Sequence, residues 1–270
     1  AHGYEITGMA GVANIGSDRN WSGSIFDQAN WYAFGRLAWD PDASAEAIAR
    51  DWTELTFSRA PEVADAITQM MMESREAVVN YMTPLGLTHL MGTGHHYGPA
   101  PWVDDLGRAD WTPYYYHKAT QEAVGFDRTE TGSGAVDQYA GPVAQEWASL
   151  DTVPDELLLW FHRIGWDHAL SNGSTLWQEL VRRYDLGVSQ VAAMQAVWAT
   201  LEDEVDADRF EQVSAFLAIQ YREAVWWRDA SIAYWQSVNG LPLPDGAVPP
   251  EHDLAHYKAL RFPNAPGQGE

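Results

Sequence analysis

The sequence predicts a mainly α-helical protein with a single strand near its N-terminus and one long aromatic loop. Along most of the chain, apolar residues recur at intervals of three and four, which is the period of an amphipathic helix. Residues 8–16, GMAGVANIG, instead form a short, mostly apolar run bounded by glycines, which is typical of a strand buried on both faces. Residues 92–134 show no helical period and are rich in glycine, proline and aromatic residues.

The predicted strand suits a parallel sheet or a barrel, whose other strands are missing from this chain. It is followed directly by a polar cluster, SDRNW, at the point where the strand would end. In α/β barrels that end of each strand carries the chemistry. Arg19, Asn20 and Trp21 are therefore candidate substrate-binding residues.

Three helices are expected before the loop. The first covers residues 25–39 and ends before an Asp-Pro pair, which disfavours helical backbone. Ser44 is the expected N-cap of the second helix, whose apolar face should be buried at Ile48, Trp52 and Leu55. The third begins at Pro61 and continues to a break at Pro84.

Helices are also expected after the loop. Residues 154–166, PDELLLWFHRIGW, predict a short helix that is buried on nearly every side. Ser174 can cap the next helix, and Gly187 is expected to end it. The longest helix should cover about 206–238, with Gly240 as its C-cap.

Composition limits the possible partners and location. The chain carries 38 acidic against 16 basic residues and a net charge of −22, so it would repel nucleic acids and anionic membranes. It lacks cysteine and has no run of 18 apolar residues. Its first residues do not have the pattern of a signal peptide, so a cytoplasmic location is favoured.

The aromatic loop is the strongest functional candidate. Long structureless loops in compact domains are usually functional, and aromatic rings beside imidazole donors suit a sugar. Its candidate substrate-binding residues are His95, His96, Tyr97, Trp102, Tyr116 and His117. An aromatic loop that merely packs on a helical body explains the composition equally well.

No metal or other cofactor is expected. The adjacent pair His95-His96 lacks the helical i, i+4 spacing of a two-histidine site, and no cysteine can assist it. A glycosidase needs two carboxylates about 5 Å or about 6.5–9.5 Å apart, and the sequence alone does not select such a pair among its acids. Asp18, Asp104 and Asp127 lie near the interesting segments, but capping and hydrogen bonding are their more common roles.

Several long motifs, in order along nearly the whole chain, give a further indication. They include GMAGVANIGSDRNWSGSIFDQANWYAFGRLAWDP, GHHYGPAPW, YYYHKATQEAVGFDRTETGS and WFHRIGWDHAL. Together they resemble the C-terminal region of glycoside hydrolase family 67, the xylan α-1,2-glucuronidases. One departure is local: relatives often have Cys and His where this chain has Ser22 and Ser24.

The resemblance implies a β-domain, a central (β/α)8 barrel with the active site, and a mainly helical C-terminal domain. Such enzymes release 4-O-methyl-glucuronic acid from xylooligosaccharides with inversion and without a metal. By resemblance, residues 1–40 are the last strand and helix of the barrel, 41–240 the helical C-terminal domain and 241–270 an extended arm. The catalytic carboxylates would then lie in the barrel, so none is assigned in this chain.

The resemblance also assigns two residues. Trp102, in GHHYGPAPW, matches a tryptophan that stacks on the sugar, and Arg261 matches an arginine of a homodimer interface. The expected partners are therefore glucuronoxylan oligosaccharides, a second copy of the chain, and the missing barrel domain. Two alternatives remain: a non-catalytic helical module that binds xylooligosaccharides or dimerises, and a pure scaffold whose aromatic loop is core.

Overall fold

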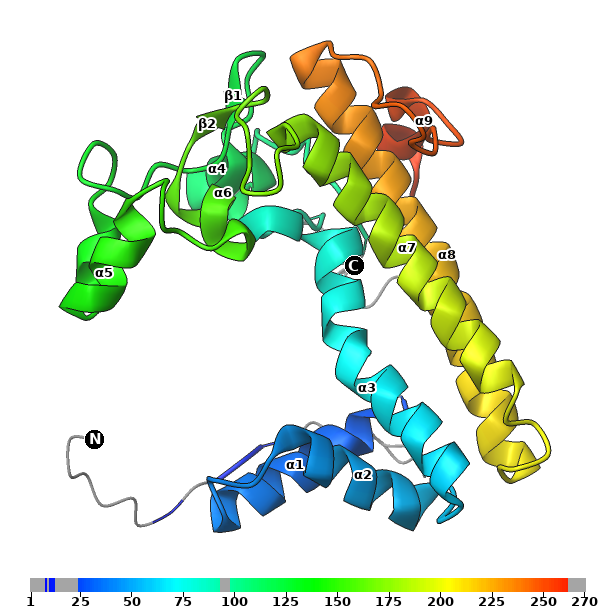
Figure 1. The fold of residues 1–270 in the computed structure, drawn as a ribbon. Helices are drawn as coiled ribbons and strands as arrows, with labels where there is room; N and C mark the ends of the chain where they lie inside the picture. Colours follow the sequence, from blue (N-terminus) through cyan, green and yellow to red (C-terminus); the bar gives the residue numbers. More distant parts are fainter. Residues whose placement is uncertain (1–7, 9, 13–23, 93–97, 262–270) are drawn as a thin grey trace. The chain divides into compact units, whose positions relative to one another are not determined.

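The computed structural model describes residues 8, 10–12, 24–92 and 98–261, and it confirms the mainly α-helical class (Figure 1). Within those ranges it contains nine α-helices and one two-stranded sheet. Most of the predicted strand at 8–16 lies outside the described residues. Gly8 and residues 10–12 are exposed and belong to no strand, so a strand here stays a prediction. None of the described helices is long and apolar enough to cross a membrane.

The chain divides into two compact units. The first comprises residues 1–75 and 191–220, and the second comprises 76–190 and 221–270. The divisions fall inside the three longest helices, which are α3 (Pro61–Met82), α7 (Leu176–Ala199) and α8 (Ala207–Asn239). The first unit also contains α1 (Asp27–Trp39) and α2 (Ala45–Thr56). The boundaries expected near residues 40 and 240 stay a prediction.

The core of the first unit is a cluster of aromatic rings. Trp198 of α7 stacks on Phe210 of α8 with 5.8 Å between ring centroids. Its edge contacts the Phe57 ring at 5.5 Å, and Phe57 in turn contacts Trp52 of α2 at 5.5 Å. The Trp198 indole N–H also donates to the Phe210 carbonyl at 3.1 Å. These rings join the ends of helices that are distant in the sequence.

The second helix begins as predicted but is not buried as predicted. The Ser44 side chain accepts a hydrogen bond from the Ala47 amide at 3.0 Å, so the N-cap is confirmed. Ile48 and Trp52 are buried. Leu55 is 65% exposed, so its expected burial is wrong, because nothing in the described part of the chain covers it.

The second unit adds several short elements between the long helices. They are η1 (Pro84–Gly86), η2 (Ala109–Trp111), α4 (Pro113–His117), β1 (Ala123–Val124), η3 (Ala135–Gln138), α5 (Gly141–Ala148), η4 (Asp155–Leu157), α6 (Leu158–Phe161), β2 (Ile164–Gly165) and α9 (Leu254–Ala259). β1 and β2 are antiparallel, with Ala123 opposite Gly165 and Val124 opposite Ile164. The helix predicted over 154–166 is therefore shorter than expected, since residues 164–165 pair with β1.

Helix α7 corrects two predictions. Gly187 does not end the helix, which continues to Ala199. A Cβ atom at Gly187 would lie 2.5 Å from the backbone nitrogen of Tyr81, so this glycine allows α7 and α3 to approach closely. The N-terminal cap is Thr175 rather than Ser174, because the Thr175 hydroxyl accepts from the Gln178 amide at 3.2 Å while the Gln178 side chain accepts from the Thr175 amide at 2.9 Å.

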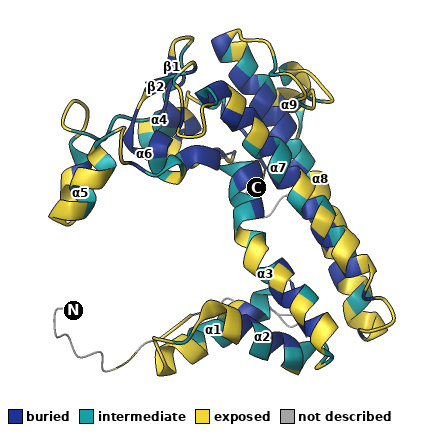
Figure 2. Cartoon of the chain, in the orientation of Figure 1, coloured by how far each residue is buried: buried dark blue, intermediate teal, exposed yellow. Residues whose placement is uncertain are grey.

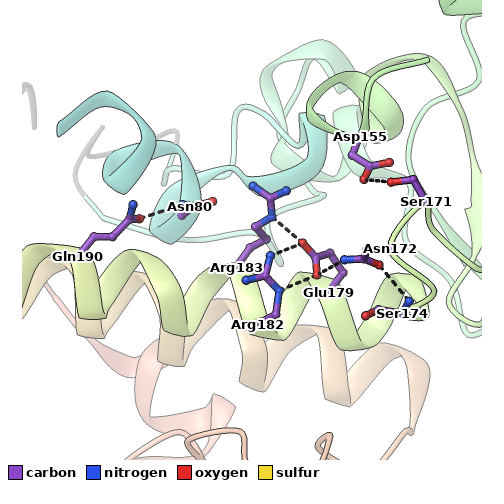
Figure 3. Close-up of polar contacts among 9 residues, drawn as sticks. All are labelled: Asn80, Asp155, Ser171, Asn172, Ser174, Glu179, Arg182, Arg183 and Gln190. Carbon is purple, nitrogen blue, oxygen red and sulfur yellow. Dashed lines mark hydrogen bonds and ion pairs between the residues drawn. The ribbon is translucent and has the colours of Figure 1, made fainter. Parts of the chain in front are cut away.

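A buried carboxylate organises the start of α7 (Figure 3). Glu179 is fully buried and accepts hydrogen bonds from Arg182 at 2.6 Å, Arg183 at 2.6 Å and Asn172 at 3.1 Å. Burial alone would raise the pKa of this carboxyl, but the two guanidinium groups lower it to about 2. The network fixes the loop before α7 and is structural.

The C-terminal tail is docked by a second buried charge. Asp229 on α8 is 1% exposed and accepts hydrogen bonds from the Glu251 amide at 3.0 Å and the Tyr257 hydroxyl at 3.3 Å. Arg228 pairs with the same carboxylate at 2.6 Å. The predicted extended arm is thus partly helical, since α9 begins where the Asp253 side chain accepts from a backbone amide. Figure 2 shows that the end of α8 beside α9 is largely buried, whereas its other end is largely exposed.

Candidate functional site

The aromatic segment, residues 98–128, contacts α8 within the second unit. At its start, Gly98 has φ +73°, and a Cβ there would overlap the Trp226 ring, so the backbone lies directly on that indole. Further on, half-buried Trp102 contacts Tyr234 edge-on, with 6.5 Å between ring centroids. Burial raises the pKa of the Tyr234 hydroxyl above its ordinary value. Trp102 is therefore held on one side by α8 and remains partly open to solvent.

His117 is the anchor of this segment. It is fully buried, and its ring lies 5.0 Å from that of Trp235. Its Nδ1 accepts from the Ala119 amide at 3.0 Å, so the proton of the neutral ring is on Nε2, which donates to the Pro101 carbonyl at 2.8 Å. Burial lowers the pKa of His117 to about 4. This histidine fixes the carbonyl that precedes Trp102.

Helix α4 orients the tyrosines that precede His117. The Thr112 side chain accepts from the Tyr115 amide at 3.3 Å, and Pro113 occupies the first helical position. The helix ends at Lys118, which has the left-handed φ of +42°. The Tyr116 hydroxyl donates to the Asp110 carbonyl at 3.0 Å, which fixes its ring.

A row of stacked side chains follows, which we call the cation–aromatic ladder. Its members are His89, Tyr116, Tyr115, Phe126, Arg128 and Trp160. His89 stacks on Tyr116 at 3.9 Å with an interplanar angle of 10°, Tyr116 contacts Tyr115 edge-on at 5.2 Å, and Tyr115 contacts Phe126 at 5.4 Å. The Arg128 guanidinium carbon lies 4.2 Å from the Phe126 ring centroid and 3.6 Å from that of Trp160. The ladder thus connects an exposed imidazole to a buried guanidinium.

The acids of this segment are held by their neighbours. The Asp127 carboxylate accepts from the Thr129 amide at 2.9 Å and from the Thr129 and Thr131 hydroxyls at 2.7 Å each. Although burial opposes the shift, these bonds lower the pKa of Asp127. Asp110 is paired with Arg108. Both carboxylates are therefore engaged in local structure, which supports the capping role over a catalytic one.

The described structure brings together only part of the predicted site. Trp102, Tyr116 and His117 lie on the aromatic segment, but His117 has no exposed surface and no free ring nitrogen, so we remove it from the direct ligand contacts. Arg261 is exposed and donates to the Lys258 and Leu260 carbonyls.

The remaining predicted residues, which are His95, His96, Tyr97, Arg19, Asn20 and Trp21, lie outside the described residues. The base of the loop that carries the first three is described. Met91 and Pro99 form an antiparallel bridge there, and the Ala100 amide donates to the Leu90 carbonyl at 2.8 Å.

Tyr116 is the only ladder member among the residues predicted for the site. The sequence did not select His89 or Arg128, the two members that carry an imidazole or a guanidinium group. The motif FDRT does indicate a role for Arg128, because an arginine between two aromatic-rich segments can stack on their rings. Nothing in the sequence indicates that His89 adopts a left-handed backbone, with φ +54°.

Comparison with known proteins decides the family. A sequence profile described as "Glycosyl hydrolase family 67 C-terminus" matches residues 22–248. The chain belongs to glycosyl hydrolase family 67. Curated relatives of this family 67 chain include alpha-glucuronidase A of Aspergillus tubingensis, 38% identical over 248 residues, and alpha-glucuronidase A of Emericella nidulans, 36% identical over 249 residues. Each alignment covers 90% of the chain but only 29% and 28% of the relative, respectively.

Proposed function

We propose that this chain is the C-terminal part of a xylan α-1,2-glucuronidase, which releases 4-O-methyl-glucuronic acid from xylooligosaccharides. One observation carries the proposal: nine tenths of the chain aligns with proteins named alpha-glucuronidase A, and it spans less than a third of their length. The two parts of the enzyme then have different roles. The chain supplies sugar-contacting side chains, and the rest of the (β/α)8 barrel, outside the chain, supplies the carboxylates of the inverting reaction.

The chemistry of the aromatic segment supports a binding role. Half-buried Trp102 offers part of an indole face, and such faces stack on the C–H surfaces of sugars. Its position is set by a buried histidine on one side and α8 on the other, which keeps the ring ordered before a ligand arrives. The candidate contacts in this proposal are Trp102, Tyr116, His95, His96, Tyr97, Arg19, Asn20 and Trp21.

The test is release of 4-O-methyl-glucuronic acid from an aldouronic acid. We expect no turnover by the 270-residue chain alone, and turnover when it is joined to the barrel region of its enzyme. In the joined protein, Trp102→Ala should lower kcat/KM about tenfold or more, the loss of about 1.4 kcal/mol or more. Trp102→Phe, which keeps an aromatic face, should retain most of the activity. Turnover by the chain alone would contradict the assignment of the carboxylates to the barrel.

The same variant separates this proposal from a pure scaffold. If Trp102 is only packing, Trp102→Ala should cost about 3–5 kcal/mol of unfolding free energy, as for a core tryptophan. If it is a binding residue, stability should change little while sugar binding falls. Urea denaturation of the isolated chain measures the first quantity, and calorimetric titration with an aldouronic acid measures the second.

Homodimerisation is a second proposal, and Arg261 is its candidate contact. Its guanidinium is exposed, and the described bonds go only to carbonyls of its own turn. Arginine is enriched at interface hot spots because its planar fork forms several bonds at once. Sedimentation velocity should show a dimer whose dissociation constant rises in Arg261→Ala but not in Lys258→Ala. A monomer at all concentrations would argue against it.

A further inference from the structure

His89 is held in an uncommon backbone conformation. Its φ of +54° is left-handed, which is unfavourable for a residue with a Cβ. In folded proteins such strain is concentrated at functional sites, where surrounding contacts maintain it. Here the contacts are the stack on Tyr116 and a hydrogen-bonding contact of 2.9 Å between His89 Nδ1 and the Thr88 hydroxyl.

The strained geometry presents the imidazole to solvent. His89 is an exposed residue, although one ring face is covered by Tyr116 at 3.9 Å. A neutral imidazole that accepts from the Thr88 hydroxyl at Nδ1 carries its proton on Nε2. No described residue forms a hydrogen bond with that Nε2. Among the described residues only Tyr116 stacks on this ring, so toward them His89 has one uncovered aromatic face and, in this tautomer, one unused donor, the two contacts that a pyranose ring can use.

The neighbouring Arg128 places a positive charge close enough to act on His89. Its guanidinium is buried, stacks on two rings and donates to the Trp160 carbonyl, and no carboxylate within the described ranges pairs with it. Other arginines do have acidic partners, such as Arg36 with Asp51. Burial lowers the pKa of His89, and the positive charge of Arg128 lowers it further.

An uncompensated buried guanidinium is unexpected in a chain with a net charge of −22. Its positive potential favours an anion over a neutral ligand at the exposed end of the ladder. Arg128 itself is too buried to reach a ligand, so His89 makes the contact. Arg128 acts as a positioning and electrostatic residue.

We propose that His89 is a binding residue for acidic xylan-derived oligosaccharides, stacking its open face on a sugar ring and donating its Nε2 proton to a sugar oxygen. Arg128 biases the site toward ligands that carry a uronate. The identity of the ligand rests on the proposed function, whereas the contact geometry rests on the ladder alone.

The experiment is a titration of the 270-residue chain, labelled at histidine Cε1, with 4-O-methyl-glucuronosyl xylotriose and with neutral xylotetraose. We expect saturable shifts of the His89 resonance with the acidic sugar, weaker shifts with the neutral one, and none at buried His117. Because the distinction between the two sugars is electrostatic, it should diminish at about 1 M salt.

The variant His89→Gly keeps the test independent of folding, since glycine adopts the left-handed backbone without strain. Its thermal stability should be equal or higher, while its affinity for the acidic sugar should fall about tenfold, the loss of about 1.4 kcal/mol. Equal affinity in His89→Gly and the parent chain would overturn the proposal, as would the absence of any shift at His89.

These outcomes are distinct from those of the proposed function. Loss of turnover in Trp102→Ala together with unchanged binding in His89→Gly would overturn the role of His89 and leave the glucuronidase assignment standing. Sugar binding at His89 in a protein that shows no turnover with its barrel would support this proposal and contradict the glucuronidase assignment.

Discussion

Particular large apolar side chains of the two units differ strongly in how far they are buried. In the second unit, Trp235 and Tyr184 are fully buried and share a hydrogen bond of 3.3 Å between the α8 indole and the α7 phenol. In the first unit, Trp39 of α1 is 91% exposed and Leu55 of α2 is 65% exposed. Large apolar side chains on helices of the two units therefore lie in different environments.

The difference shows where other parts of the same chain cover the apolar side chains and where they do not. Exposed apolar side chains in such number along short helices are typical of surfaces that contact another domain or protein. Under the proposed function, the barrel is the natural occupant of the α1 and α2 surface. Each unit has its own buried core, and the second unit carries the aromatic segment on its core.

The largest expected difference is between two tryptophans. Trp235→Ala should lower the unfolding free energy by about 3–5 kcal/mol, because it removes a buried ring that contacts His117 and Trp166. Trp39→Ala, the matched change at an exposed tryptophan, should change it by less than about 0.5 kcal/mol. Urea denaturation of the isolated chain measures both. Equal losses would mean that the α1 surface is covered in solution, for example by a second copy.

The unfolding free energy should also depend on pH through His117 of the second unit, and this effect is smaller. Unfolded His117 takes up a proton near pH 6.5, whereas the buried ring resists protonation down to about pH 4. The unfolded state binds more protons in that window, so stability falls as the pH decreases through it, by about 2.5 kcal/mol between about pH 7 and about pH 4.5.

The variant His117→Gln isolates this contribution from that of the many carboxylates. Its side-chain amide can still donate to the Pro101 carbonyl but does not titrate. Its unfolding free energy should be lower at neutral pH and should change less than that of the parent between the two pH values. An unchanged pH dependence would show that His117 does not account for the loss.

Local sequence patterns predicted the helices well and their surroundings poorly. The Ser44 cap and the limits of α3 and α8 follow from short-range chemistry, and the structure confirms them within one or two residues. Gly187 was predicted to end a helix because glycine is a poor helix former. Its true role depends on Tyr81, more than 100 residues earlier, and no local pattern contains that contact.

Prediction of the candidate site from the sequence is limited in the same way. Composition identified the aromatic segment, yet it could not separate a buried histidine from an exposed one. His117 and His89 are of one residue type, but His117 is buried with both nitrogens engaged by backbone groups, whereas His89 is exposed. That distinction arises from which side of each ring the tertiary contacts cover. Arg128 is recognised as part of the site only from its stacking on Phe126 and Trp160 in the structure.

The smallest changes in stability are expected from two glycine-to-alanine substitutions, one in each unit, and these changes should have opposite signs. Gly187→Ala places a Cβ 2.5 Å from the Tyr81 backbone, so α7 and α3 must separate, at a cost of about 1–3 kcal/mol. Gly35→Ala, within α1, meets no described atom within 4 Å and should stabilise the chain by up to about 1 kcal/mol through helix propensity. Thermal unfolding of both variants measures the difference. A destabilising Gly35→Ala would show that α1 is in close contact with another surface, and the contrast between exposed Trp39 and buried Trp235 would then fail.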